Sequence, residues 1–290
     1  MSALDTVSAP ALTRRTSPSR GLLLAMLRVH RSALLFWLGL VVVAAGALLW
    51  ALGPGADNAW AEYRASGCSG DSPNLGCDLP GPAHGRYETV VACASGLLAV
   101  LPVLTGAWAG GALIGRELES GTAQLAWTQS VTPARWLAAK LAVPALLLVP
   151  GTLAITLLHR TVWASDTHTT RSLGWRYWHD DSVFEANGTL ATAHPLAALA
   201  LGVLAGLVVR RALPALAAAT LAVTALIYVL DEVRPHLWPV PPRTLVVMHG
   251  HPASHFWPLQ LVETGIVLAV AALATAASFA LLRRRTGVAV

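Results

Sequence analysis

The sequence predicts an all-α membrane protein with six transmembrane helices, and its composition, its apolar runs and the placement of its charges support this. Of its 290 residues, 55% are hydrophobic and only 12% are charged, and the mean hydropathy is +0.58. Soluble domains carry roughly 25% charged residues. The apolar runs are continuous and approach the ~20 residues that a helix needs to cross a bilayer, whereas barrel strands alternate over ~10 residues. Helical spans are therefore favoured over a β-barrel.

Six spans are predicted, each bounded by polar residues. They cover residues 32–52, 89–114, 136–159, 190–209, 212–230 and 259–282. Only Arg210 and Arg211 separate the fourth and fifth spans, which could also form one long helix. Pro214 favours two helices, because proline is tolerated in the first turn of a helix and disrupts its interior.

The basic residues predict that both termini lie in the cytoplasm. With the N-terminus inside, the inner segments hold thirteen of the twenty Lys and Arg residues but only three of the fifteen acidic residues, a net charge of +10. The outer segments then carry a net charge of −5. Positive inner loops set membrane orientation. The basic residues are spread over the ends of apolar runs and form no single patch, so no nucleic-acid partner is expected.

The segments outside the spans suggest a tail, an interfacial helix and three outer loops. Residues 1–19 are rich in Ser, Thr, Pro and Arg and predict a disordered cytoplasmic tail, and residues 20–290 predict a single transmembrane domain. Residues 20–31 predict an amphipathic helix in the inner interface, or else a simple extension of the first span. The outer loops cover residues 53–88, 160–189 and 231–258, and the Pro- and aromatic-rich third loop predicts a compact cap or a re-entrant piece.

The first outer loop contains Cys68 and Cys77. An oxidising compartment would allow these cysteines to form a disulfide, although spacing alone leaves two free thiols as an alternative.

Glycines and tryptophans predict contacts within and around the spans. Gly106 with Gly110, Gly111 with Gly115, and Gly202 with Gly206 have the four-residue spacing that lets helices approach closely in lipid. This spacing does not distinguish contacts within one chain from contacts between two chains. Five tryptophans near predicted interfaces are expected to form an aromatic belt: Trp50, Trp108, Trp136, Trp163 and Trp257.

The inner connection between the second and third spans is the most informative segment. Arg116, Glu117 and Glu119 end one helix, and Gly121 and Thr122 follow. Thr132 suits a helix N-cap and Pro133 the first helical position, so the third span is expected to start there. The segment predicts a short charged element placed to receive a push from a cytoplasmic partner. An ordinary solvated connector is the alternative.

Two motifs resemble the permease subunits of type-2 ABC exporters, most closely an actinobacterial group. The first is Arg116-Glu117-x-Glu119-x-Gly121-Thr122, followed by Trp127, Pro133-x-Arg135-Trp136 and Lys140. The second is His251-Pro252-Ala253-Ser254-x-Phe256-Trp257-Pro258-x-Gln260-x-x-Glu263, at the outer end of the last span. The long first outer loop with its two cysteines departs from the simplest members.

The resemblance implies a type-2 ABC exporter permease architecture in the plasma membrane of a bacterium. It implies a dimer with a second copy of the chain or a related permease, two ABC ATPase subunits, and coupling to them through the element from Arg116 to Thr122. The chain lacks a phosphate-binding loop of the Gly-x-x-x-x-Gly-Lys-Ser/Thr type. We therefore expect no cofactor on this chain and ATP with Mg²⁺ on the partner ATPase.

By family analogy, a substrate path is expected along the second and fifth spans. The polar groups there are Thr105, Thr220, Thr224 and Tyr228. An apolar path suits a hydrophobic or amphipathic substrate such as a drug-like compound, a lipid or a peptide.

Two other classes of function remain open from the sequence. His249, His251 and His255 have a spacing that could ligate zinc in a membrane metalloenzyme, although no metal site is favoured. An ion- or proton-coupled secondary transporter would need embedded carboxylates, for which Glu263 is the best candidate. Asp231, Glu232 and Glu88 also lie at outer span ends.

Overall fold

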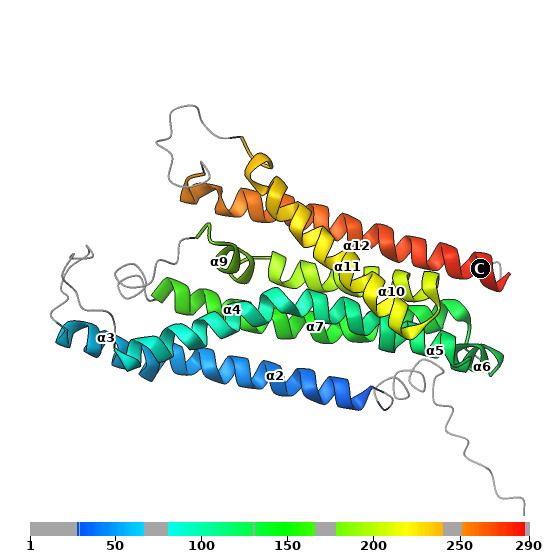
Figure 1. Cartoon of the computed structure of the whole chain (residues 1–290), viewed down its shortest axis with the longest axis horizontal. Coiled ribbons are helices and arrows are strands. Elements are labelled where there is room, and N and C mark those ends of the chain that lie inside the picture. The colour runs from blue at the N-terminus through cyan, green and yellow to red at the C-terminus, as the bar shows by residue number, and fades with distance from the viewer. Residues whose placement is uncertain are drawn as a thin grey trace, which may run out of the picture.

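The computed structural model is a bundle of long helices (Figure 1). It describes residues 28, 30–66, 81–129, 131–165, 178–239 and 251–287. The elements in chain order are α2 (Arg31–Trp50), η1 (Ala51–Gly55), α3 (Ala56–Ala65), α4 (Pro82–Trp108), η2 (Ala109–Gly115), α5 (Arg116–Glu119), α6 (Thr122–Thr128), α7 (Pro133–Ser165), α9 (Asp181–Ala186), α10 (Leu190–Val209), α11 (Ala212–Val233), η3 (Arg234–His236), η4 (Ala253–His255) and α12 (Phe256–Thr286).

Six helical segments are long and apolar enough to cross a membrane, which confirms the predicted number of spans. The segments are Arg31–Ala65, Pro82–Glu119, Pro133–Ser165, Leu190–Val209, Ala212–His236 and Ala253–Thr286. Arg210 adopts a left-handed conformation with φ 61° and breaks the chain between α10 and α11, so the fourth and fifth spans are separate helices. Thr132 caps α7 as expected, because its hydroxyl accepts a hydrogen bond from the amide of Arg135 at 3.3 Å.

The predicted outer loops were too long. Residues 56–65 of the first loop form α3, and α4 begins at Pro82 within the same predicted loop. The second loop is shortened by α7, which continues to Ser165, and contains α9. A helix can continue beyond the membrane into water because its backbone hydrogen bonds are internal. Hydropathy marks only the part of each helix that lies in the membrane. Cys68, Cys77, the tail at residues 1–19 and most of the amphipathic segment at residues 20–31 lie outside the described residues.

Helix α10 is the centre of the bundle. Its most apolar stretch is 61% buried within the single chain, compared with 11% for the first span. It packs against α4, η2, α7, α11 and α12, whereas α2 and α12 lie along opposite edges (Figure 1). The outer helices expose large apolar side chains such as Phe36 and Val43, both 71% exposed. Lipid is the solvent that suits such surfaces.

Glycines allow α4 and η2 to approach α10 and α11 closely. A Cβ atom on Gly202 would lie 2.5 Å from the carbonyl oxygen of Gly106 and 2.7 Å from the Cβ atom of Ala109. On Gly110 it would lie 2.7 Å from the carbonyl oxygen of Ala215. The small-residue contacts predicted from spacing therefore occur within the chain. Helices in lipid gain stability from such close van der Waals packing.

The first span bends where it leaves its apolar run. Gly53 departs from helical geometry with φ −113° and ψ −105°, and Pro54 follows it inside the π-helical segment η1. The bend directs α3 toward the start of α4, where the Glu62 carboxylate accepts a hydrogen bond from the amide of His84 at 2.8 Å. Glu62 thereby satisfies one of the free amides in the first turn of α4.

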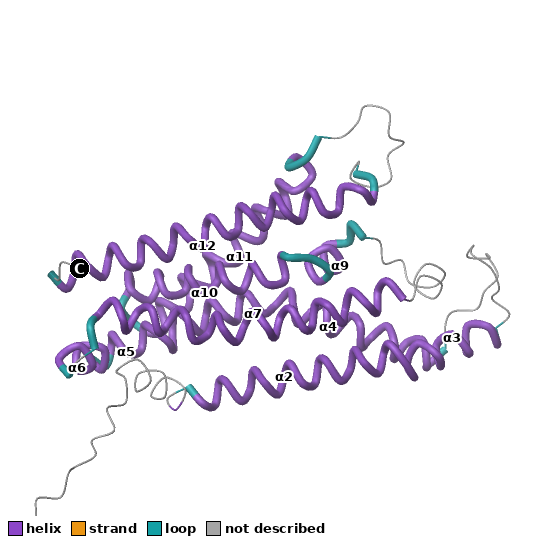
Figure 2. Tube along the Cα trace, turned by 180° about the vertical axis from the view of Figure 1, so that it is seen from behind, coloured by secondary structure: helices purple, strands orange, loops and turns teal. Residues whose placement is uncertain are grey.

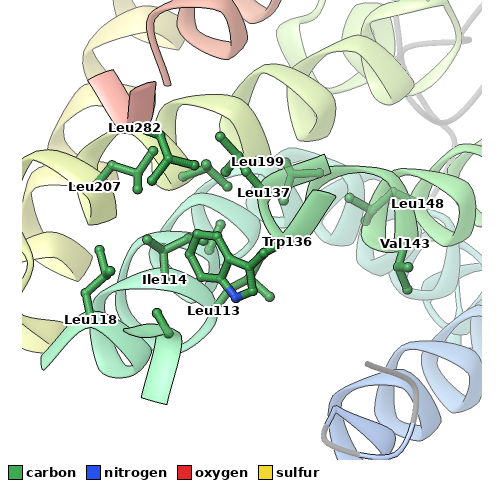
Figure 3. Close-up of a cluster of buried hydrophobic side chains, with 13 residues drawn as sticks. Leu113, Ile114, Leu118, Trp136, Leu137, Val143, Leu148, Leu199, Leu207 and Leu282 are labelled. Carbon is green, nitrogen blue, oxygen red and sulfur yellow. The ribbon is translucent and has the colours of Figure 1, made fainter. Parts of the chain in front are cut away.

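Three apolar clusters fill the bundle. One lies toward the end of the bundle that holds α6 and gathers buried residues of η2, α5, α6, α7, α10 and α12 (Figure 3). There Trp136 and Leu137 of α7 lie beside Leu113 and Ile114, while Leu282 comes from the far end of the sequence. A second cluster joins α2, α3, α4 and α7, and a third joins α9 to α12. Every span therefore has at least one buried face against another span.

Glycine packing can be tested by adding one methyl group at two positions. We expect Gly202→Ala to destabilise the protein by about 1–3 kcal/mol, because the new Cβ atom meets backbone that has no room to move. Gly96→Ala is the matched control, since nothing lies within 4 Å of its added Cβ atom. The measurement is thermal unfolding in detergent. Equal unfolding temperatures for the two variants would contradict the close α4–α10 contact.

Candidate functional site

The connection between the second and third spans forms a compact element at one end of the bundle, called here the α6 end (Figure 2). Helix α5 ends at Glu119, and Gly121 takes φ 76°, a left-handed conformation that reverses the chain into α6 and suits glycine. The hydroxyl groups of Ser120 and Thr122 lie 3.1 Å apart across this turn. Arg116, Glu119 and Thr122 are exposed. The element is structured and also open to contact.

Glu117 binds the third span. Its carboxylate forms an ion pair with the buried ammonium group of Lys140 on α7 and accepts a hydrogen bond from the Trp136 indole at 3.1 Å. The Lys140 ammonium also lies 3.2 Å from Nε2 of His30. Burial first, and then the Lys140 charge, holds the pKa of His30 below its ordinary value. A neutral His30 can accept from Lys140, so three segments meet at one ammonium group.

This cluster changes two expectations drawn from the sequence. Trp136 was expected to anchor at the membrane interface, but only 3% of it is exposed and its indole binds Glu117. Lys140 was named in the first motif without a role of its own. In the structure it is the buried ion-pair partner of Glu117. Its signal in the sequence is its position as a lone charge inside an apolar run.

Glu119 binds the fifth span. Its carboxylate accepts a hydrogen bond from the amide of Ala212 at 2.8 Å, in the first turn of α11. A carboxylate at this position caps a free amide and complements the positive end of the helix dipole. Together, Glu117 and Glu119 connect the α5–α6 element to α7 and to α11. The face of α6 that points away from the bundle carries exposed side chains, among them Leu125, which is 58% exposed.

At the opposite end of the bundle, called here the α9 end, Arg234 gathers carboxylates from three helices. Its guanidinium donates to Glu263 at 2.9 and 3.0 Å, to Asp181 at 3.0 Å and to Asp231 at 2.6 Å. Glu185 lies 3.9 Å away. The Phe184 ring is 4.5 Å below the guanidinium carbon. Arg234 thus connects α9, α11 and α12, and the sequence analysis had counted it only as an outer charge.

The motif at the start of α12 fastens that helix to its neighbours. Gln260 is fully buried, and its amide donates to the carbonyl of Phe184 at 2.6 Å and accepts from the amide of Leu190 at 3.3 Å. The Arg160 guanidinium lies 4.7 Å from the centre of the Trp257 ring. Pro258, half-buried, lies in the first turn of α12 and suits that position because proline lacks an amide hydrogen. With Glu263 on Arg234 and His251 on the carbonyl of Pro235, the buried polar members of the motif have partners.

A buried polar chain joins the second and third spans to the turn before α10. Ser95 Oγ lies 2.8 Å from His159 Nε2, and His159 Nδ1 lies 2.8 Å from Asn187 Oδ1. The Ser95 hydroxyl also lies within 3.1 Å of the Val91 carbonyl, as helix hydroxyls commonly do. All three side chains are less than 5% exposed. These contacts pair the Ser95 hydroxyl, both ring nitrogens of His159 and the Asn187 side-chain oxygen within an apolar interior, where unpaired polar groups are costly.

The expected substrate-path residues do not face one interior. Thr105 is 7% exposed inside the bundle, whereas Tyr228 is 63% exposed. Thr220, Thr224 and Tyr228 follow at intervals of four residues and so lie along one face of α11. Thr105 lies inside the bundle and Tyr228 lies on its surface, so no single path within this conformation of the chain is lined by all four residues.

The residues of the two other functional classes are also placed. Glu263 is fully buried against Arg234, so the best candidate for a proton-carrying carboxylate is held by a fixed cation. His251 Nδ1 lies 3.0 Å from His255 Nδ1, and His251 Nε2 lies 3.0 Å from the carbonyl of Pro235. His249 lies outside the described residues.

The fold and the two polar ends define an all-α, multi-pass membrane protein with a structured connection at one end. A family model described as ABC-2 membrane transporter related matches residues 39–234, and the chain belongs to that family. The family supports a transport subunit, an ABC-2 type permease, that works with an ABC ATPase and dimerises. No curated protein and no solved structure matches the chain.

The Glu117–Lys140 pair can be tested by breaking it and then by neutralising it. We expect Lys140→Met to destabilise the protein by about 1–3 kcal/mol, because it leaves the partly buried Glu117 carboxylate without its cation. The double variant Lys140→Met with Glu117→Gln should recover most of that loss, since the amide still accepts from Trp136. Thermal unfolding in detergent measures both. Additive losses in the double variant would show that the pair is not coupled.

The Arg234 cluster predicts that stability depends on pH. Burial, and next the Asp231 charge, raises the pKa of Glu185 from 4.5 to about 7. Between pH 4.5 and pH 7, Glu185 keeps a proton in the folded state that it releases in the unfolded chain. The free energy of unfolding therefore falls as pH rises through this interval. Between pH 5.5 and pH 8 the loss is about 2 kcal/mol. Thermal unfolding of Glu185→Gln should lack this slope, and Glu232→Gln, at an exposed carboxylate, should keep it. If the stability of Glu185→Gln still falls with rising pH, the pH dependence belongs to another titrating group.

Proposed function

We propose that this chain is the transmembrane subunit of an ATP-driven exporter, and that α5 and α6 receive the movement of its partner ATPase. One observation carries the proposal: Glu117 binds Lys140 on α7 and Glu119 binds the first amide of α11. A displacement of the element would therefore act on the second, third and fifth spans together. The exposed residues Arg116 and Thr122, with Gly121 between α5 and α6, form the coupling element on this proposal.

The proposal places the α6 end in the cytoplasm of a bacterium of the actinobacterial group that the motifs resemble, with the chain in the plasma membrane. The positive residues support this orientation: Arg135, Arg210 and Arg211, and Arg283–Arg285 all lie at that end. Two copies of an ABC ATPase would hold ATP with Mg²⁺, and this chain would hold neither. The second half of the permease would be another copy of this chain or a related chain.

The transport mechanism on this proposal is alternating access. ATP-driven closure of the ATPases would press on α6, tilt the linked spans and open a central path. Thr220, Thr224 and Tyr228 support a path at the surface shared with the second half, because they line one outward face of α11. The apolar side chains around them suit a hydrophobic or amphipathic substrate, and Thr105 would contribute only if the bundle opened.

Leu125 offers a sharper test than Glu117, whose replacement would disturb a buried ion pair. We expect Leu125→Gln to weaken binding of the partner ATPase about tenfold and to lower substrate-stimulated ATP hydrolysis, because an exposed apolar contact is lost. Leu213→Gln is the control, since Leu213 is 79% exposed at the same end but on α11. Affinity capture of the ATPase and ATP turnover in proteoliposomes measure both effects.

Two results would count against the proposal. Equal binding and turnover for Leu125→Gln and the unmodified protein would remove α6 from the contact. Transport by the purified chain without any ATPase would show that the energy comes from elsewhere.

A further inference from the structure

A groove with a volume of about 390 Å³ lies between α7, α10 and α12 toward the α9 end. Its walls are apolar side chains such as Leu153, Leu157 and Leu268. Its polar lining includes Arg160, Asn187 and Thr264. The volume falls within the range of roughly 300–1,000 Å³ found for small-molecule sites. None of these residues belongs to the α5–α6 element.

The polarity of the groove changes along the bundle axis. Helix α7 runs from the α6 end toward the α9 end, so Leu153 lies about 10 Å deeper than Arg160 at a rise of ~1.5 Å per residue. Asn187 belongs to the turn before α10, at the same end as Arg160. The groove therefore has a polar head region at the α9 end and an apolar region toward the middle of the span.

The groove opens sideways, toward the bilayer. Leu153, Leu157 and Leu268 are 48%, 54% and 43% exposed, although each lines the groove. All three lie on segments that are apolar enough to cross the membrane. An occupant would therefore enter from the lipid rather than from water.

Arg160 is the charged group at the head of the groove, and it carries no ion pair with any described residue. Its guanidinium donates one hydrogen bond, to the carbonyl of Asn187 at 2.8 Å, and lies over the rings of Phe256 and Trp257 at 5.4 and 4.7 Å. These contacts fix the side chain in place without neutralising it. A cation held at the edge of a lipid-facing groove favours an anion there.

Two further polar atoms at the groove have no partner among the described residues. They are Oγ1 of Thr156 and Nδ2 of Asn187, on side chains that are 6% and 1% exposed. Unpaired buried polar atoms are uncommon and costly. A phosphate headgroup bound nearby would bring acceptor oxygens to the donor-rich head region.

We propose that this groove binds an anionic phospholipid, with its phosphate on Arg160 and one acyl chain along Leu157, Leu153 and Leu268. The proposal adds a lipid site to the protein and does not depend on the transport function. Zwitterionic phospholipids would enter the same apolar region but gain less at Arg160, because their own cation offsets the phosphate charge.

The experiment is native mass spectrometry of the full-length protein, titrated with phosphatidylglycerol and, separately, with phosphatidylcholine. We expect the unmodified protein to bind phosphatidylglycerol about fivefold more tightly, which is the usual effect of one arginine near anionic lipid. Arg160→Gln should remove this preference. Arg64→Gln is the matched control, because Arg64 also lies over an aromatic ring, that of Trp60 at 5.9 Å, and does not line the groove.

A second pair of variants tests the apolar region and remains informative if Arg160→Gln fails to fold. Leu153→Trp should weaken binding of both lipids by filling the groove, whereas Leu146→Trp, on the same helix and 71% exposed, should not. An unchanged lipid preference in Arg160→Gln, or equal binding by the two tryptophan variants, would overturn the proposal. Displacement of phosphatidylglycerol by millimolar inorganic phosphate would also overturn it, since that result defines a free-anion site.

Discussion

The close approach of α4 and η2 to α10 and α11 is the contact on which the rest of the bundle depends. In a bilayer, apolar side chains gain little by leaving lipid for protein, so helix association relies on packing and on polar contacts. Gly202 lets the α10 backbone meet the α4 backbone at Gly106, and Gly206 leaves room on α10 for the Ile114 side chain of η2. Once α10 is fixed there, α7 and α12 can pack on its remaining faces.

Ion pairs hold each of the two ends of the bundle together, and their burial makes breaking them costly in free energy. Lys140 joins the α5–α6 element to α7, and Arg234 joins α9, α11 and α12. A buried charge without its partner would cost several kcal/mol. These pairs therefore specify which helices are neighbours, while the apolar faces alone would permit several arrangements. On the proposed function, the first of them also links the ATPase-facing element to the spans that move.

The α9 end differs from the α6 end in how its polar groups are used. Arg234 binds carboxylates, Gln260 binds backbone groups, and Ser95, His159 and Asn187 form a chain, so most polar groups there serve packing. Arg160 is the exception, because its contacts are a backbone carbonyl and two aromatic rings. The proposed lipid site follows from that difference. The Phe184 ring under Arg234 and the Phe256 ring under Arg160 meet edge-to-face, with their centres 5.5 Å apart.

The sequence by itself determined the number of spans, the break at Arg210 and Arg211, and the start of α7 at Pro133, because hydropathy, capping and proline geometry act within a few residues of the chain. It also located the segment around Glu117 from the pattern of its residues. Only the tertiary structure decided that Glu117 faces Lys140, that Trp136 is buried and that the glycine contacts lie within one chain. The physical reason is that a partner in space depends on which helices become neighbours, and a local pattern of residues does not contain that information.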